Sequence, residues 1–152
     1  MKLSAKIAEI LFVGEEKLTI AESFTGGAIC AEITQNPGIS KVFFEGIICY
    51  SNLSKQIRLN VSENTIKSFG AVSRETAYEM LCGIKTYYGI VTTGNAGPTS
   101  EKDSDNGHCF IGIKMGDNVF VNEYYFCGSR AEVIQQGKNT ALKLFYEQLK
   151  NC

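Results

Sequence analysis

Ser23 lies between a short apolar segment and a pair of glycines, Gly26 and Gly27. Residues 17–21 are predicted to form a buried strand and residues 28–34 a helix, so Ser23 falls in the turn between them. The first turn of a helix presents unpaired backbone N–H groups and the positive end of its dipole. Because glycines let an anion approach the backbone closely, the serine hydroxyl would lie beside donors suited to a developing oxyanion.

The same stretch has a simpler interpretation. In it, Thr25 caps the helix, and Gly26 and Gly27 only turn the chain. The stretch matches neither the nucleophile pattern G-x-S-x-G nor the phosphate-loop pattern G-x-x-x-x-G-K-[ST]. These residues alone leave both interpretations open.

Two further predicted strands end in turns that carry polar or small residues. Residues 46–50 lead into a turn that contains Tyr50 and Lys55, and residues 89–93 lead into a tight loop that ends at Pro98. Ligands bind beyond the carboxyl ends of parallel strands, so a parallel arrangement would bring the three turns to one edge of the sheet. The residues expected around one pocket are Ser23, Tyr50, Lys55, Thr93 and the loop glycines Gly94 and Gly97.

Lys55 is the candidate base for the serine, because the one histidine, His108, lies in a different type of segment. Only a neutral lysine accepts a proton, and at its ordinary pKa about one lysine in a few thousand is neutral at pH 7. A working Lys55 would need a pKa lowered by burial or by a nearby cation, for which Arg58 and Arg130 are candidates. The simpler alternatives are a solvated loop lysine and, for Tyr50, a core aromatic.

Composition bounds the class of protein. The 152 residues predict a single domain, residues 1–152, with 15 Lys plus Arg against 16 Asp plus Glu and a formal net charge of −1. Without a block of like charge, neither nucleic acid nor an anionic membrane is the expected partner. The apolar runs are too short to span a membrane, and charged residues interrupt the first seventeen positions. We therefore expect a soluble, cytoplasmic protein.

The six cysteines do not predict disulfides. Five of them fall in apolar or small-residue segments and none forms a C-x-x-C pair, so buried free thiols are expected. With a single histidine, a histidine-rich zinc site is not expected either. We predict no metal and no cofactor. The cysteines are Cys30, Cys49, Cys82, Cys109, Cys127 and Cys152.

Helices and strands alternate early in the chain, and a hairpin follows late. This order predicts an α/β fold: a three-layer α/β/α sandwich with a mixed, mostly parallel sheet of about five strands. Residues 51–59 are interpreted as a polar turn and residues 99–106 as a mobile polar loop. The expected helices are 3–13, 28–34, 63–68, 73–85 and 130–150, and the expected strands are 17–21, 46–50, 89–93, 107–115 and 119–126.

Six short motifs occur in order over about residues 5–149. They are Ala21-Glu22-Ser23-x-Thr25-Gly26-Gly27, Pro37-Gly38-x-Ser40, Tyr50-Ser51-Asn52-x-x-Lys55, Gly70-Ala71-Val72-Ser73, Thr93-Gly94-x-Ala96-Gly97-Pro98 and Gly128-x-Arg130, followed by Ala141-Leu142. The series resembles the CinA C-terminal-domain family, the nicotinamide-nucleotide amidases. The longer members of that family carry a molybdopterin-binding-like domain, so the resemblance implies the stand-alone form.

The resemblance implies hydrolysis of the carboxamide of nicotinamide mononucleotide to nicotinic acid mononucleotide and ammonia, a step of pyridine-nucleotide salvage. It assigns the nucleophile to Ser23, its partner to Lys55 and the motif tyrosine to Tyr50. We further expect a small-molecule nucleotide as ligand and a homodimer or higher homo-oligomer. The residues expected to bind the oxyanion are Thr25, Gly26 and Gly27, and those expected to bind the phosphate are Thr93, Gly94, Asn95, Ala96, Gly97 and Arg130.

Three positions depart from the family pattern. The loop after Pro98 lacks the usual glycines, Asn95 replaces a commonly apolar residue, and Ser129 replaces a common Asp. None of these departures falls at a catalytic candidate, that is, at Ser23, Tyr50 or Lys55. They leave open a second reading, a non-catalytic nucleotide-binding or competence/damage-associated interaction domain on the same fold.

Overall fold

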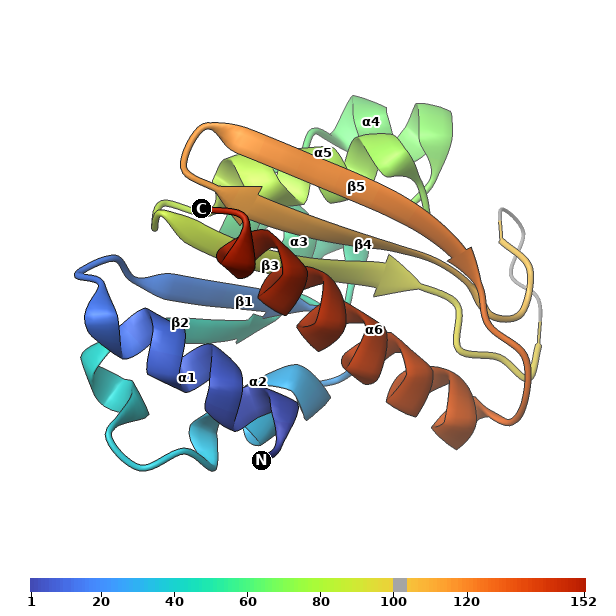
Figure 1. Cartoon of the computed structure of the whole chain (residues 1–152). Coiled ribbons are helices and arrows are strands. Elements are labelled where there is room, and N and C mark those ends of the chain that lie inside the picture. The colour runs from blue at the N-terminus through green and yellow to red at the C-terminus, as the bar shows by residue number, and fades with distance from the viewer. Residues whose placement is uncertain (100–103) are drawn as a thin grey trace.

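The computed structural model describes residues 1–99 and 104–152, and it contains a five-stranded sheet (Figure 1). The strand order across the sheet is β2-β1-β3-β4-β5. The predicted mobile loop falls in part on residues 100–103, which lie outside the described residues. The strands are β1 (Leu18–Glu22), β2 (Phe43–Ile48), β3 (Tyr88–Gly94), β4 (His108–Met115) and β5 (Asn118–Tyr125).

The sheet is mixed, as the sequence predicts. Strand β1 pairs in parallel with both β2 and β3, whereas β3–β4 and β4–β5 are antiparallel. Three neighbouring strands, β2, β1 and β3, thus run parallel, and the hairpin of β4 and β5 completes the predicted mixed sheet of five strands. The three parallel strands end at one edge of the sheet, and the turns that follow them carry the predicted site residues.

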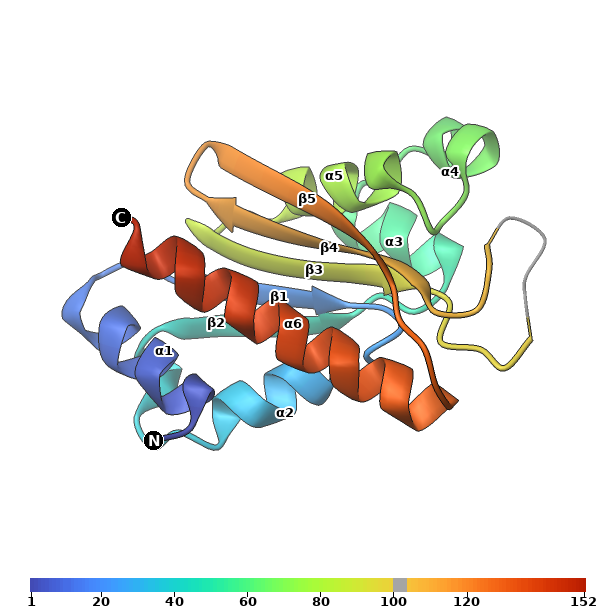
Figure 2. The ribbon, with the colours of Figure 1, turned by 45° about the vertical axis from the view of Figure 1, so that its right-hand side comes forward.

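Helices cover both faces of the sheet, which gives the three predicted layers (Figures 1 and 2). One face carries α1 (Leu3–Val13), α2 (Ala28–Thr34) and α6 (Arg130–Lys150). The other carries α3 (Asn52–Leu59), α4 (Glu63–Phe69) and α5 (Arg74–Gly83), with α4 packed on α5.

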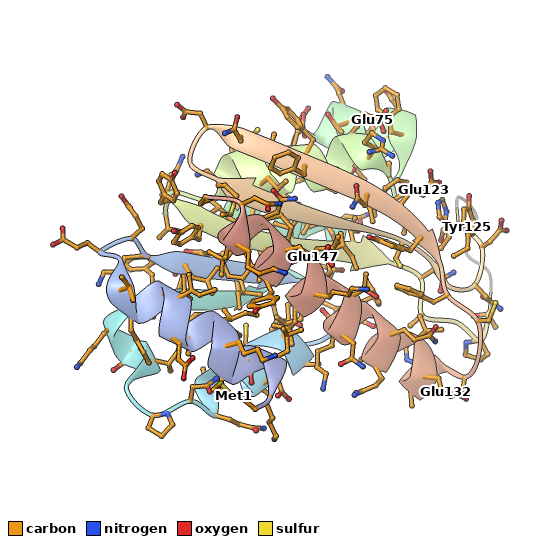
Figure 3. All side chains as sticks on the ribbon, in the orientation of Figure 1. Met1, Glu75, Glu123, Tyr125, Glu132 and Glu147 are labelled. Carbon is orange, nitrogen blue, oxygen red and sulfur yellow. The ribbon has the colours of Figure 1, made fainter. Side chains whose placement is uncertain are left out.

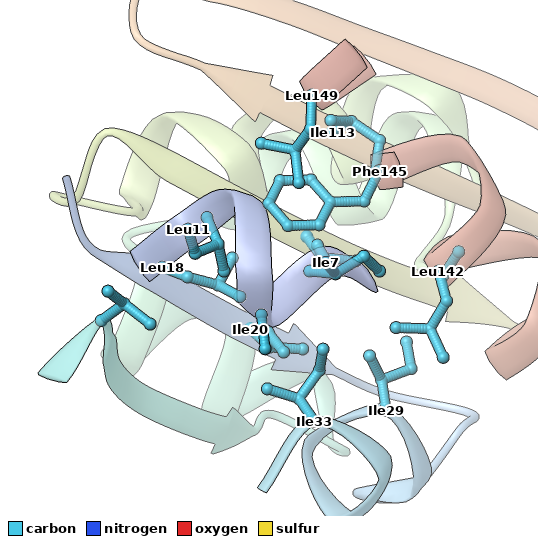
Figure 4. Close-up of a cluster of buried hydrophobic side chains, with 14 of the residues drawn as sticks. Ile7, Leu11, Leu18, Ile20, Ile29, Ile33, Ile113, Leu142, Phe145 and Leu149 are labelled. Carbon is cyan, nitrogen blue, oxygen red and sulfur yellow. The ribbon is translucent and has the colours of Figure 1, made fainter. Parts of the chain in front are cut away.

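Each face has its own apolar core. On the α1/α2/α6 face, Ile7, Ile29 and Phe145 belong to one buried cluster with Ile20 of β1 (Figure 4). On the other face, Leu59 of α3 belongs to a second cluster with residues of α5 and β3. Burial of these side chains from both directions holds β1 and β3 at the centre of the sheet.

Two sequence-based assignments near the site are wrong. Residues 52–59 form α3, not a polar turn: Ser51 caps the helix by accepting the Ser54 N–H at 3.0 Å, and only Lys55 and Leu59 are buried. Two buried positions in eight residues give too weak a periodicity to predict a helix. Strand β2 begins and ends earlier than the apolar run 46–50, so Cys49 and Tyr50 follow the strand.

All six cysteines are free, but only some are buried. Cys49 and Cys109 are buried and Cys30 is half-buried, and burial raises the pKa of the Cys109 thiol to about 12. The prediction of burial is wrong for Cys82 and Cys127, which are exposed, as is Cys152 at the last position. No helix in the described part of the chain is long and apolar enough to cross a membrane.

Candidate active site

The turn that carries Ser23 is tied to the neighbouring strand β3. The backbone N–H of Ser23 donates to the carbonyl and to the hydroxyl of Thr92, at 3.1 and 3.2 Å. The hydroxyls of Thr92 and Thr25 lie 2.9 Å apart, so Thr25 faces β3 and does not cap α2. Thr92 was not among the predicted site residues, although it is adjacent to Thr93 at the end of an otherwise apolar strand.

The carboxylate of Glu22 caps α2 instead. Its two oxygens accept the N–H groups of Ile29 at 3.0 Å and Cys30 at 2.9 Å, and its side chain is fully buried. The positive end of the helix dipole and the two charge-assisted hydrogen bonds make burial of this carboxylate tolerable. Those two N–H groups are therefore occupied, which leaves only donors earlier in the turn for a ligand.

The turn retains such donors. Gly26 donates its N–H to the Ser23 carbonyl at 3.0 Å. The N–H groups of Phe24, Thr25 and Gly27 donate to no acceptor within residues 1–99 and 104–152. Gly26 and Gly27 have φ of 60° and 102°, values that favour glycine and let the chain turn this tightly.

Lys55 lies against Ser23. Its Nζ is 3.0 Å from the Ser23 Oγ, and it also contacts the carbonyl oxygens of Cys49 at 3.1 Å and Tyr50 at 3.3 Å. Lys55 is 2% exposed, so the solvated-loop alternative is wrong. Helix α3 explains the burial, because Lys55 and Leu59 are one turn apart on the face that covers the sheet.

Cys49 is a neighbour of this pair but not a competing nucleophile. Burial raises the pKa of its thiol, although the charge of Lys55 acts in the opposite direction. The thiol therefore stays protonated at neutral pH, and its contribution to the pair is the main-chain carbonyl that contacts Lys55.

Tyr50 and Arg130 form the outer part of the site. Tyr50 is 55% exposed and is not a core residue; its hydroxyl accepts from Arg130 Nη2 at 2.8 Å. Arg130 Nη1 donates to the Gly97 carbonyl at 2.7 Å. Contact between Tyr50 and Lys55 runs through the main-chain carbonyl of Tyr50, not its phenol. Arg130 pairs with no carboxylate in the described part of the chain.

Helix α6 begins at Arg130, so the position of this side chain follows from the helix start. Ser129 caps α6 by accepting the Glu132 N–H at 3.2 Å, and the Glu132 carboxylate accepts the Ser129 N–H at 3.3 Å. Glu132 lies in the first turn of α6 (Figure 3). This reciprocal capping fixes the first residue of the helix.

A cavity of about 110 Å³ connects these residues. Its lining includes eight of the twelve predicted site residues; Thr25, Gly26, Gly27 and Gly97 do not line it. Arg58, the other candidate cation near Lys55, is exposed and lies outside the cavity as well. Thr93 lines it while donating its hydroxyl to the Ala71 carbonyl at 2.7 Å. Four lining residues were not predicted as site residues: Phe24, Asn52, Ala71 and Val72. The last three of these lie inside the quoted motifs. The lining is Ser23, Phe24, Tyr50, Asn52, Lys55, Ala71, Val72, Thr93, Gly94, Asn95, Ala96 and Arg130.

Comparison with known proteins gives one consistent answer. The sequence model of the CinA C-terminal domain matches residues 1–149. A "CinA-like protein" from Fusobacterium nucleatum is 44% identical over 144 residues, which are 93% of this chain and 36% of the relative. The chain thus spans about a third of the length of that curated relative.

Solved structures are similar over nearly their whole length. A CinA superfamily protein from Klebsiella pneumoniae has a TM-score of 0.94 at 25% identity, covering 99% of this chain and 97% of that one. The competence/damage inducible protein CihA from Agrobacterium tumefaciens has a TM-score of 0.90 at 30% identity, covering 97% and 93%. The mixed sheet and its two helical layers are therefore shared with these proteins.

Proposed function

Because the chain belongs to the CinA C-terminal domain family, we propose that it hydrolyses the carboxamide of nicotinamide mononucleotide to nicotinic acid mononucleotide and ammonia. The observation that carries the proposal is the 3.0 Å hydrogen bond between Lys55 Nζ and Ser23 Oγ, with both side chains buried. A buried lysine against a serine hydroxyl is the arrangement that serine–lysine acyl transfer requires. The reaction would belong to pyridine-nucleotide salvage.

The contacts of Lys55 define how it can act as a base. A charged ammonium has three N–H donors and no lone pair, and it can satisfy the Ser23 hydroxyl and two carbonyls together. A neutral amine has two N–H donors and one lone pair. If the carbonyls of Cys49 and Tyr50 keep the two donors, the lone pair is directed at the Ser23 hydroxyl, which then becomes the proton donor. The two carbonyls therefore orient the base.

The reaction then proceeds in two halves. Ser23 Oγ attacks the carboxamide carbon and its proton passes to Lys55 Nζ, forming a tetrahedral oxyanion. The C–N bond breaks, Lys55 returns the proton to the departing nitrogen, and ammonia leaves an ester on Ser23. Water attacks this ester with Lys55 as base, and the bond to Ser23 breaks to release the acid and restore the hydroxyl. The candidate oxyanion donors are the N–H groups of Phe24, Thr25 and Gly27, which have no acceptor in the described part of the chain.

The outer part of the site suits the phosphate of the substrate. A cavity of about 110 Å³ is smaller than the several hundred that usually enclose a ligand, so the carboxamide end enters and the rest lies at the mouth. Arg130 is at that mouth, and no carboxylate within residues 1–99 and 104–152 forms an ion pair with it. Its guanidinium can pair with phosphate while Tyr50 and Gly97 hold it.

Incubation of the purified protein with nicotinamide mononucleotide tests the proposal. Equal amounts of ammonia and nicotinic acid mononucleotide should appear, and the rate should be proportional to protein concentration. A protein that binds the nucleotide in calorimetry but releases neither product would instead be the non-catalytic binding domain.

A further inference from the structure

Asn95 lines the Ser23 cavity, but its side-chain amide is engaged in the segment that follows β3. Its Oδ1 accepts the Gly97 N–H at 2.9 Å, and its Nδ2 donates to the carbonyls of Thr99 and Ser104 at 3.2 and 3.4 Å. Asn95 is 7% exposed. The amide therefore acts on the chain around it and is not presented to a ligand.

The backbone of Asn95 is held equally firmly. Its N–H donates to the His108 carbonyl at 2.9 Å, and its carbonyl accepts the Gly107 N–H at 2.7 Å. These two bonds anchor Asn95 to the start of β4, so the side chain acts from a fixed point. A fixed donor and acceptor set can impose one conformation on the residues that it contacts.

Asn95 reaches Arg130 through a single residue. The bond from the Gly97 N–H to Asn95 Oδ1 is a local side-chain turn, which sets the orientation of Gly97 at its φ of 81°. The carbonyl of the same Gly97 accepts from Arg130 Nη1 at 2.7 Å. Arg130 in turn donates from Nη2 to the Tyr50 hydroxyl. One chain of hydrogen bonds thus joins the loops after β3 and β2 to the start of α6.

We propose that Asn95 is a positioning residue for Arg130. By fixing Gly97, it holds the guanidinium at the cavity mouth and so sets the preference for a substrate that carries a phosphate over one that does not. Asn95 does this without touching the substrate. The inference rests on the proposed function, because it assigns the phosphate to Arg130.

The two groups that bind the Arg130 guanidinium, the Gly97 carbonyl and the Tyr50 hydroxyl, support this role. A carbonyl and a phenol fix the guanidinium but leave its positive charge intact, whereas a carboxylate would neutralise it. An arginine held in this way stays available for an anion and pays little ordering entropy when the anion binds. Loss of the Gly97 anchor would release the side chain and weaken anion binding.

A pair of variants that differ by one oxygen tests the inference. Asn95→Ala removes every side-chain bond, whereas Asn95→Ser keeps a hydroxyl that can accept the Gly97 N–H in the same kind of turn. Both are made in a Ser23→Ala background, which prevents turnover, and calorimetry gives the Kd for nicotinamide mononucleotide and for nicotinamide riboside. The measured quantity is the ratio of the riboside Kd to the mononucleotide Kd.

We expect Asn95→Ala to lower this ratio about tenfold, the size of one lost charge-assisted contact, and Asn95→Ser to stay within about threefold of the parent. Arg130→Gln should lower the ratio as well, and adding Asn95→Ala to it should change the ratio no further. Thermal unfolding of each variant checks the fold; if Asn95→Ala does not fold, Asn95→Ser and Asn95→Thr are compared with Arg130→Gln.

Three outcomes would overturn the inference: a ratio unchanged in Asn95→Ala, independent multiplicative effects of Asn95→Ala and Arg130→Gln, or a parent that binds both ligands equally well. Failure of the proposed function is a separate result. In that case the protein with Ser23 intact hydrolyses no nucleotide, while the binding ratio still depends jointly on Asn95 and Arg130.

Discussion

The Nζ atom of Lys55 lies 3.0 Å from the Oγ atom of Ser23, although the two residues are 32 positions apart in the chain. Ser23 follows β1 and Lys55 belongs to the helix that follows β2, and these two strands are parallel neighbours. The contact therefore depends on the parallel pairing of two strand–helix connections. A shift of either strand by one residue would separate the pair.

Replacement of Lys55 by Met should abolish nearly all hydrolysis of nicotinamide mononucleotide, with a loss of about a thousandfold or more in kcat. The apolar side chain has a similar length but accepts no proton. Steady-state ammonia release measures the effect. The double variant with Ser23→Ala should be no worse than either single variant, because residues that act as one unit are not additive. A double variant far worse than both would indicate independent roles.

The rate should rise with pH, because Lys55 must lose its proton before it can accept one from Ser23. In a plot of rate against pH, Arg130→Gln should move the rising part of the curve (the limb) to higher pH. Loss of a positive charge at the same cavity makes Lys55 easier to protonate. Arg58→Gln is the matched control: Arg58 is exposed and outside the cavity, so the limb should stay in place. A limb that moves equally in both variants would contradict this reasoning.

Glu22→Gln should destabilise the protein by about 1–3 kcal/mol. In the unaltered protein both carboxylate oxygens accept a helix N–H. The amide of the variant keeps one acceptor oxygen, but its NH₂ group, a donor, faces the other helix N–H. Urea unfolding gives the free energy, and Glu32→Gln is the control, because the pair of Glu32 with Lys138 is partly exposed at 3.5 Å. Equal stability of the Glu22→Gln variant and the parent would refute the capping role.

Thiol labelling should distinguish the three exposed cysteines from the two buried ones. At pH 8 a disulfide reagent should react rapidly with Cys82, Cys127 and Cys152, which are exposed. Cys49 and Cys109 should react only after unfolding, because burial raises the pKa of both thiols and shields them. Mass spectrometry of labelled peptides identifies the sites. Rapid labelling of Cys109 in the folded protein would contradict the structure.

Local signals in the sequence predicted much of the fold. Helix α2 starts after a glycine pair and ends before Pro37, and α6 starts at a serine cap, so both have the predicted bounds. Helix α3 was missed because only two of its residues are buried. The mixed sheet of five strands was predicted, but its strand order was not, since sequence order alone does not fix which strands become neighbours.

The residues around the predicted site depend on tertiary packing in a similar way. Lys55 was a candidate from its motif, but its burial requires α3, which the sequence did not predict. Glu22 was quoted in a motif, yet its role as a helix cap appears only when β1 meets α2. Asn95 was predicted as a ligand-binding residue and lines the cavity, but the bonds of its amide to the surrounding loop were not predicted. The hydrogen-bond partners of these side chains depend on which residues lie close together in the folded protein, and a local sequence pattern does not predict that.

The role of Ser23 as nucleophile is tested most directly by comparing ammonia release from nicotinamide mononucleotide by the unaltered protein and by Ser23→Ala. We expect the variant to lose about a thousandfold or more in rate, since it lacks the attacking oxygen, while its unfolding temperature and its Kd for the nucleotide stay close to those of the parent. Undiminished ammonia release by purified Ser23→Ala would contradict the assignment of Ser23 as nucleophile, and with it the serine–lysine mechanism.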